Sequence, residues 1–383
     1  MAIAIALVIM VAGSVLFHFL SPWWATPLAS NWKQMDDTLT ITLVITGVFF
    51  VVINLLVGYI AWRFRHREGH RAAYEPENPR LERWLIGLSA VGIMALLAPG
   101  LIVYADYVRP PREAMELEVV GQQWQWAFRF PGTSGQLGTT DPRFVSGSNP
   151  LGLNPEDPNG QDDVIVVGPE VHLPLNRPVK VLLRSKDVLH DFYVPPIRAR
   201  MNMVPGMVTS FWFTPTQAGK FDILCAQLCG VGHYNMRGHV VVEDQAAFDA
   251  WLAKQQTFAM AMAKAAQPAP AAAAAASGDL AGQGRALAQG KGCVACHSVD
   301  GGASVGPTWK GLFGSTQAFA DGSSATVDDA FLRKEIEDPQ ARLVKGFGPV
   351  MPKLPLTDAE VAALSAYIQS LGSGAAGAPQ AGK

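Results

Sequence analysis

The first hundred residues contain three long apolar stretches separated by short polar ones. Residues 2–20, 39–62 and 84–107 carry almost no charged side chains. Each is long enough to cross a bilayer as a helix, which takes about 20 residues. The first stretch also resembles a secretory signal peptide, but it lacks a basic start and no small-residue cleavage site follows. We predict transmembrane helices within residues 1–110 and leave open whether residues 1–20 are cleaved.

The segment between the second and third apolar stretches is basic. It carries six arginines, namely Arg63, Arg65, Arg67, Arg71, Arg80 and Arg83. Arginine-rich loops stay on the cytoplasmic side. We therefore expect a multi-pass membrane protein, with everything after residue 107 on the extracytoplasmic side.

The pattern changes to short strand-like runs from residue 111 to about residue 250. Pro and Gly separate six such runs, which cover residues 117–130, 162–174, 178–185, 207–215, 219–226 and 238–244. Short alternating runs with turn residues between them predict a β-sandwich or barrel. We expect the polar interval 131–163 to be a surface loop rather than a cation site of Asp157, Asp162 and Asp163.

Two further segments complete the predicted domain order. Residues 251–278 are rich in Ala and Pro and predict a linker without a core. Residues 279–372 predict a small, all-α unit, because 328–339 and 357–371 read as amphipathic helices that begin at Asp or Thr. Residues 373–383 predict a disordered tail.

Composition narrows the class of protein. Hydrophobic residues make up 49% of the chain and charged residues 16%, which fits a membrane-anchored protein. The net charge of −2 offers no basic patch, so we expect no nucleic-acid partner. The four cysteines form two pairs in two different contexts.

The first pair lies in the stretch CAQLCGVGHYNM, residues 225–236. Cys225, Cys229, His233 and Met236 are soft or borderline metal ligands. A structural zinc site has no use for the methionine, and a blue-copper site needs only one cysteine. Two bridging thiolates could instead hold two copper ions, which then require a second imidazole.

Three histidines could supply that second imidazole. His190 follows a strand-like run, where a loop could face the metal-binding stretch. His172 and His239 lie within apolar runs and are expected to be ordinary strand residues. We therefore favour His190.

The second pair forms the c-type haem attachment motif Cys293-x-x-Cys296-His297. Both thiols would bond covalently to haem c, and His297 would be the proximal iron ligand. A redox-active cysteine pair is the alternative, but it needs a βαβ context that this segment lacks. Met351 is the single methionine after Met262, so we predict it as the second axial ligand. A His/Met pair raises the iron potential.

These motifs resemble a known family. His190 and the stretch 225–236 closely resemble the dinuclear copper (CuA) motif of cytochrome c oxidase subunit II, and GQQWQW resembles its aromatic segment. Residues 279–372 resemble a class I cytochrome c, including GPTWKGLFG. The resemblance implies transmembrane helices, a cupredoxin-like β-sandwich and a cytochrome c domain. It places the copper ligands at six positions: His190, Cys225, the carbonyl of Gln227, Cys229, His233 and Met236.

Three residues have roles that the resemblance suggests less specifically. The family more often has Glu at position 227, where its carboxylate helps to hold magnesium, so the magnesium site is uncertain with Gln227. Trp124 matches the position where electrons reach the copper, although alternating Trp residues are also ordinary strand packing. Glu82 lies near the mouth of the family's proton path, but a carboxylate at a helix start also favours the helix dipole.

The resemblance implies an electron-input subunit of a respiratory haem–copper oxidase. Electrons would pass from a cytochrome c-type donor through haem c and CuA to subunit I, which reduces oxygen to water. The partners would be subunit I, other oxidase subunits, the donor and membrane lipid. The corresponding subunit of a CuA-containing nitric oxide reductase remains an alternative. A nitrous oxide reductase would need a second, His-rich copper cluster, and a copper-delivery protein would not carry covalent haem.

Overall fold

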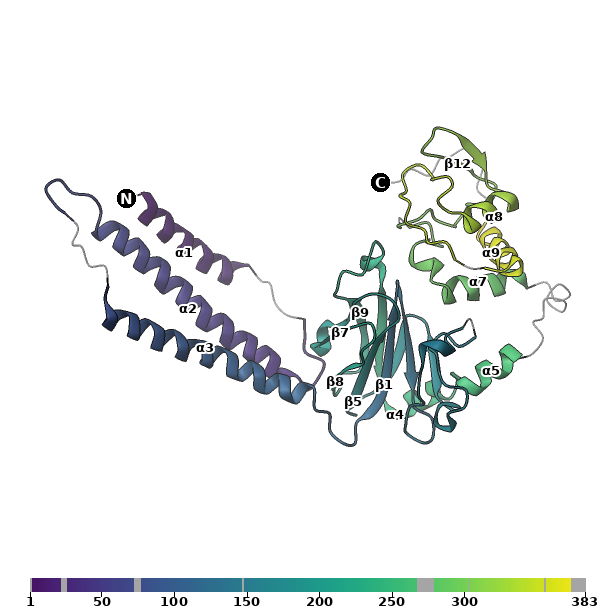
Figure 1. Cartoon of the computed structure of the whole chain (residues 1–383), viewed down its shortest axis with the longest axis horizontal. Helices are drawn as coiled ribbons and strands as arrows, with labels where there is room; N and C mark the ends of the chain where they lie inside the picture. The colour runs from purple at the N-terminus through teal and green to yellow at the C-terminus, as the bar shows by residue number, and fades with distance from the viewer. Residues whose placement is uncertain are drawn as a thin grey trace. The chain divides into compact units, whose positions relative to one another are not determined.

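The computed structural model describes residues 2–21, 26–71, 77–146, 148–266, 279–302, 304–354 and 356–372. The chain forms two compact units (Figure 1). One consists of Met1–Pro110 with Pro196–Arg198, and the other of Pro111–Pro195 with Ala199–Lys383. The first unit is helical, and the second contains the sheets and the remaining helices.

The helical unit contains α1 (Ala2–Leu20), α2 (Lys33–Arg63) and α3 (Pro79–Tyr107), each long and apolar enough to cross a membrane. The three predicted helices are confirmed. Helix α3 begins before its apolar stretch because Asn78 accepts a hydrogen bond from the amide of Leu81, and Pro79 occupies the first turn. The apolar side chains of all three helices are mostly exposed, as expected for surfaces that face lipid or other subunits.

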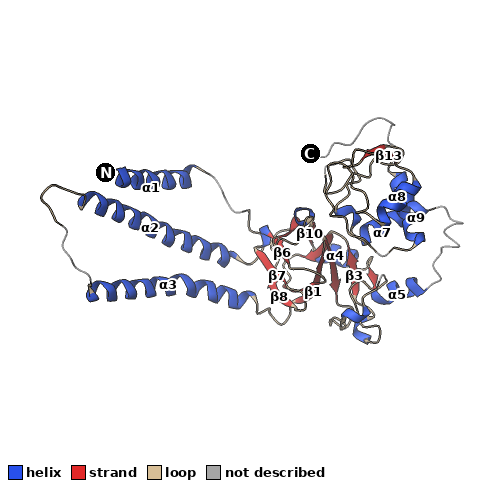
Figure 2. Ribbon diagram, turned by 45° about the horizontal axis from the view of Figure 1, so that its top comes forward, coloured by secondary structure: helices blue, strands red, loops and turns tan. Residues whose placement is uncertain are grey.

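The second unit contains the predicted β-sandwich, whose strands are red in Figure 2. In order, the six-stranded sheet contains β11 (Gln256–Thr257), β3 (Val164–Val167), β2 (Gln125–Phe130), β1 (Met115–Gln122), β5 (Val179–Ser185) and β8 (Thr209–Phe213). The five-stranded sheet contains β4 (Glu170–Pro174), β10 (Arg237–Glu243), β9 (Gly219–Cys225), β6 (His190–Val194) and β7 (Ala199–Met203). The β1–β5 and β4–β10 pairs are parallel.

Apolar side chains from both sheets fill the sandwich. Trp126 of β2 meets Phe192 of β6 edge to face, with ring centroids 5.6 Å apart, and both rings are buried. Strands β6 and β7 were not among the predicted runs. Strand β6 buries the polar His190 and Asp191, so its sequence does not alternate between apolar and polar positions.

The first part of the predicted linker, residues 251–266, forms regular structure instead. Helix α4 (Gln245–Leu252), strand β11 and helix α5 (Phe258–Ala266) follow β10, and β11 pairs with β3. Phe258 is fully buried against Val120, Leu151 and Leu153. Residues 256–266 therefore belong to the β-sandwich domain. The rest of the predicted linker, 267–278, and the predicted tail, 373–383, lie outside the described residues.

The interval 131–163 is a surface loop with two short 3-10 helices, η1 (Pro142–Phe144) and η2 (Pro158–Gly160). Its carboxylates hold the loop together. Asp157 accepts from Thr139, and Asp162 accepts from Thr133. Asp163 is buried and pairs with Arg129 at 2.7 Å. The loop interpretation is therefore supported over the cation site.

The C-terminal part contains α7 (Leu280–Gly290), η5 (Cys293–Ala295), a small hairpin of β12 (Thr316–Ala318) and β13 (Ser324–Thr326), α8 (Asp329–Glu337) and α9 (Asp358–Ser370). Both predicted amphipathic helices form. Asp328 caps α8, and Thr357 with Glu360 makes a reciprocal capping box on α9. The C-terminal part has its own buried core, which includes Trp309, Phe331 and Leu364.

Candidate metal centres

The β9–β10 connection carries the first cysteine pair. Cys225 is the last residue of β9, and its amide donates to the carbonyl of Met236 at 3.2 Å, which closes the loop at its base. His190 is the first residue of β6. Strand β6 pairs with β9, with Phe192 opposite Cys225, so the sheet brings His190 to the loop from 35 positions upstream.

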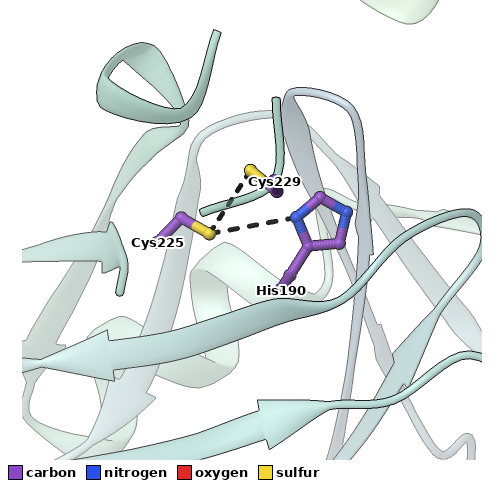
Figure 3. Close-up of side chains that lie close together, drawn as sticks. All are labelled: His190, Cys225 and Cys229. Carbon is purple, nitrogen blue, oxygen red and sulfur yellow. Dashed lines mark hydrogen bonds between the residues drawn. The ribbon is translucent and has the colours of Figure 1, made fainter. Parts of the chain in front are cut away.

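The two thiols lie at the centre of the donor group. The sulfur atoms of Cys225 and Cys229 are 3.7 Å apart, and Nδ1 of His190 lies 3.9 Å from the Cys225 sulfur (Figure 3). Nδ1 of His233 lies 3.6 Å from the Cys229 sulfur, and Sδ of Met236 lies 3.9 Å from it. The carbonyl oxygen of Gln227 is 3.2 Å from the Cys225 sulfur.

These distances fit a metal centre. Bonds of about 2.0–2.3 Å to an ion place its ligand atoms about 3–4 Å apart. Each thiol has one imidazole neighbour. The Gln227 carbonyl lies beside the Cys225 sulfur, and the Met236 thioether lies beside the Cys229 sulfur. The set of two thiols, two imidazoles, a thioether and a carbonyl is soft enough for copper. The ligand assignment itself remains a prediction.

The two thiols shift each other's pKa in opposite directions. The hydrogen bond from Cys229, with help from His190, lowers the pKa of Cys225 despite burial. The same bond to Cys225, together with burial, raises the pKa of Cys229. Burial opposes the charged form of His190, but hydrogen bonds to Asp187 and Cys225 outweigh it and raise its pKa to about 9. The pocket thus favours a thiolate, which is the form that binds metal.

Asp187 is a site residue that the sequence analysis missed. Its Oδ1 accepts a hydrogen bond from Nε2 of His190 at 2.8 Å, which leaves Nδ1 facing Cys225. Its Oδ2 accepts from the amide of Gln123 at 2.7 Å. Asp187 therefore orients the imidazole, as carboxylates commonly do for ligating histidines. An Asp three residues before the candidate histidine was the available signal.

Trp124 lies against the metal-binding loop rather than within a strand. Gln122 pairs with Gln125, so Gln123 and Trp124 form the tight turn between β1 and β2. The indole Nε1 of Trp124 donates to the carbonyl of Cys229 at 3.2 Å, and Nε2 of Gln123 donates to the same oxygen at 2.8 Å. The contact joins Trp124 to the backbone of a candidate copper ligand.

Gly232 makes room for that indole. A Cβ at position 232 would lie 2.4 Å from a ring carbon of Trp124. We expect Gly232→Ala to displace the indole and to lower electron delivery to the copper centre by about 10–100-fold, the usual cost of losing an outer contact of a metal site. Stopped-flow reduction of the copper band measures the rate. Val231→Ala in the same loop is the control, because the side chain of Val231 is exposed. An unchanged rate in Gly232→Ala would contradict this role of Trp124.

The other two histidines lie elsewhere on the sandwich. His172 stacks on Trp251, with ring centroids 4.4 Å apart, and its Nδ1 is 2.7 Å from Glu243. His239 lies in β10 with Nε2 3.4 Å from Asp222. Both are strand residues, in agreement with the sequence analysis.

The second cysteine pair borders an apolar pocket in the C-terminal part. Cys293, Cys296, His297 and Met351 all line it, as does Trp309. The predicted attachment thiols and both predicted axial ligands are thus collected around one cavity. Burial raises the pKa of Cys293 to about 11 and also raises that of Cys296, which keeps both thiols neutral.

The imidazole of His297 is held in one orientation. Its Nδ1 donates to the carbonyl of Pro307 at 2.8 Å, so Nε2 remains for iron. The ring stacks on Trp309, with centroids 5.1 Å apart and planes 22° from parallel. A Cβ on Gly306 would lie 2.7 Å from the ring. Burial lowers the pKa of His297, which favours the neutral ligand form. The pocket therefore fits a c-type haem.

We expect Met351→Ala to lower the haem midpoint potential and to remove the weak sulfur-to-iron absorption band, because a His/Met pair holds the potential high. Redox titration followed optically measures the change. The matched control is Met260→Ala, since Met260 is exposed on α5 and distant in sequence from the haem motif. If Met351→Ala keeps the native potential, another group is the sixth ligand.

Glu82 lies in the first turn of α3, and its side chain is exposed. Both interpretations from the sequence, a proton-path residue and a helix-start carboxylate, place it there. Its role therefore stays a prediction.

A soft metal-donor set on a β-sandwich, a c-type haem motif beside a pocket and three candidate membrane helices define a membrane-anchored metalloprotein with two cofactor sites. Two family models match it. Residues 115–244 match the periplasmic domain of cytochrome c oxidase subunit II, and residues 281–372 match cytochrome c.

The chain is also similar to individual proteins of the same kind. The alternative cytochrome c oxidase subunit 2 of Bradyrhizobium diazoefficiens is 56% identical over 259 residues, which cover 68% of this chain and 94% of the relative. Cytochrome c oxidase subunit 2 of Alkalihalophilus pseudofirmus is 24% identical over 355 residues, 90% of this chain and 89% of the relative. A crystal structure of the periplasmic domain of subunit II from Bradyrhizobium japonicum is 23% identical, with a TM-score of 0.28, over 38% of this chain and 95% of that one.

The chain belongs to the cytochrome c oxidase subunit II family and carries a cytochrome c domain after the periplasmic domain. It is a subunit of an oxidoreductase, a cytochrome c oxidase.

Proposed function

We propose that this chain is the electron-input subunit of its oxidase. It would receive electrons from a cytochrome c-type donor and deliver them, by way of haem c and a dinuclear copper centre, to subunit I for the reduction of oxygen to water. Bound at their sites, the two cofactors supply one-electron transfer. The observation that carries the proposal is the presence of both donor sets in one chain: two thiols 3.7 Å apart with an imidazole beside each, and a haem pocket.

The protein's contribution is to hold the ligands still. Asp187 fixes the ring of His190, and the closed base of the loop fixes Cys225 and Met236. Electron transfer is fast when the metal–ligand geometry changes little between the oxidised and reduced states. A rigid scaffold keeps the ligands in place and so keeps the reorganisation energy low. Trp124, hydrogen-bonded to the Cys229 carbonyl, is the residue through which we propose that electrons reach the copper.

The proposed setting follows from the helices and the arginine-rich segment. The chain would be a multi-pass protein of the cell inner membrane, in contact with lipid, subunit I and other oxidase subunits, with both cofactor sites on the periplasmic side. We propose that residues 1–110 anchor the chain and that the copper domain runs from 111 to 266. Residues 279–372 would then form the cytochrome c domain. A magnesium ion near Gln227 stays a prediction.

The test uses the purified complex. A reduced-minus-oxidised spectrum should show haem c and the dinuclear copper centre, and oxygen consumption should accompany oxidation of the donor. Nitric oxide consumption is assayed alongside. A complex that consumes nitric oxide but not oxygen would overturn the assignment of oxygen as the final acceptor and favour the reductase alternative.

A further inference from the structure

The haem pocket has a cation at its border. Arg342 and Glu335 both line the pocket that also contains His297 and Met351. Nη2 of Arg342 donates to Glu335 at 3.1 Å, and the two side chains are 28% and 17% exposed. The guanidinium carbon lies 3.8 Å from the ring centroid of Phe319. The ring therefore fixes where the guanidinium lies.

One donor of this guanidinium lacks an acceptor. Nε of Arg342 is buried and has no hydrogen-bond partner among the residues that the structure describes. Buried polar groups almost always have a partner, and a charged donor left without one is especially costly. A guanidinium has five N–H groups, and the contact with Glu335 uses one of them. Glu335 therefore does not satisfy this guanidinium, and its Nε–H has no acceptor among the described residues.

Haem supplies such an acceptor. Its porphyrin ring is apolar, like most of the pocket lining, but it carries two propionate groups. Arginine binds carboxylates through parallel N–H donors, which suits a propionate at a fixed position. Gln317 is a further polar side chain in the pocket lining; it is buried, and its Nε2 donates to Ser315 at 3.2 Å.

We propose that Arg342 binds a haem propionate through the guanidinium N–H groups that Glu335 leaves free. The inference rests on the proposed haem c site. A fixed positive charge disfavours the oxidised haem and so raises its potential. It also keeps the bound propionate ionised, since a neighbouring cation favours the charged carboxylate. Arg342 is thus a positioning residue that sets the potential of the haem.

The experiment is a redox titration of the haem in the full-length complex from about pH 5 to about pH 9. The wild-type potential should change with pH less than that of Arg342→Gln, because Arg342 keeps one of the two propionates ionised. Arg342→Gln should lower it and should make it fall with rising pH, because the freed propionate then titrates in this range and ionises more readily beside oxidised haem. Covalent haem should remain, since Cys293 and Cys296 are untouched. Absence of covalent haem from the wild-type protein would instead refute the haem site itself.

Three variants separate this role from a purely structural one. Arg342→Lys keeps the charge and should restore the pH dependence of the wild-type potential. Glu335→Gln keeps Arg342 and should raise the potential without adding pH dependence. Arg333→Gln removes an exposed cation that pairs with Glu337 and Asp358 outside the pocket lining, and should change neither quantity.

Either of two results would overturn the proposal. One is an Arg342→Gln protein with covalent haem and the wild-type potential at every pH. The other applies if Arg342→Gln does not fold: in the wild-type protein one propionate Raman band should remain that of an ionised carboxylate from about pH 5 to about pH 9, and two bands that both titrate in this range would mean that Arg342 does not bind a propionate.

Discussion

Replacing Cys229 with serine is expected to abolish the dinuclear copper spectrum and to reduce turnover with the donor by more than about 100-fold, since losing even an outer contact of a metal site costs 10–100-fold. The Cys229 sulfur lies 3.7 Å from that of Cys225, 3.6 Å from His233 and 3.9 Å from Met236. A hydroxyl is a harder and far less acidic ligand than a thiol. The variant would therefore lack the Cys229 thiolate, which lies next to Cys225, His233 and Met236.

Copper analysis and electron paramagnetic resonance check this prediction. We expect less than two copper ions per chain and no signal from an electron shared between two ions. The covalent haem should be unaffected, because Cys293 and Cys296 belong to a separate pocket. Met351→Ala is the reciprocal control: it should alter the haem and spare the copper spectrum. A full copper complement with an unchanged spectrum in Cys229→Ser would show that Cys229 is not a bridging ligand.

Ending the chain after Ala266 is expected to leave the copper centre intact while turnover with the natural donor falls by about 100-fold or more. All six predicted copper ligands precede residue 266, and α5 remains in place. The expected loss of turnover arises because the haem is no longer tethered to the copper domain. The 13 peptide links from Ala266 to Asp279 span at most about 45 Å, so the intact chain keeps the haem at millimolar effective concentration. Small artificial reductants that reach the copper directly should still support oxygen consumption.

The position of the cut decides whether this experiment can be interpreted. A chain that ends after Lys254 lacks β11 and Phe258, which is fully buried with Val120, Leu151 and Leu153. Removing such a phenylalanine costs about 3–5 kcal/mol of unfolding free energy. The shorter chain should therefore unfold at lower denaturant concentration and lose copper, whereas the chain ending at Ala266 should not. If the longer chain oxidises the natural donor at the full rate, the haem is not where electrons enter.

The sequence predicts well what depends on neighbouring residues. The membrane helices follow from unbroken apolar stretches, and the capping box at Thr357 and Glu360 follows from a four-residue pattern. The metal-binding loop and the Cys293-x-x-Cys296-His297 motif are equally local. In each case the chemistry is complete, or nearly so, within about a dozen residues.

Predictions fail where burial reverses the usual pattern. Strand β6 begins with His190 and Asp191, both buried, so it has no apolar alternation to detect. The segment 251–278 looks like a linker because Ala and Pro dominate it as a whole. Its short β11 pairs with β3, however, and the single side chain of Phe258 fills a gap in the core.

The sequence by itself determined the kinds of ligand, the attachment motif and the membrane anchor, because these depend on residue type and spacing along the chain. Only the tertiary structure decided how His190 reaches Cys225, that Asp187 orients its ring, that Trp124 donates to the Cys229 carbonyl, and that Arg342 lines the haem pocket. Each of these joins residues far apart in the sequence. Their proximity depends on the pairing of β6 with β9, on the β1–β2 turn and on the packing of Phe319 against Arg342, and no local pattern encodes such pairings.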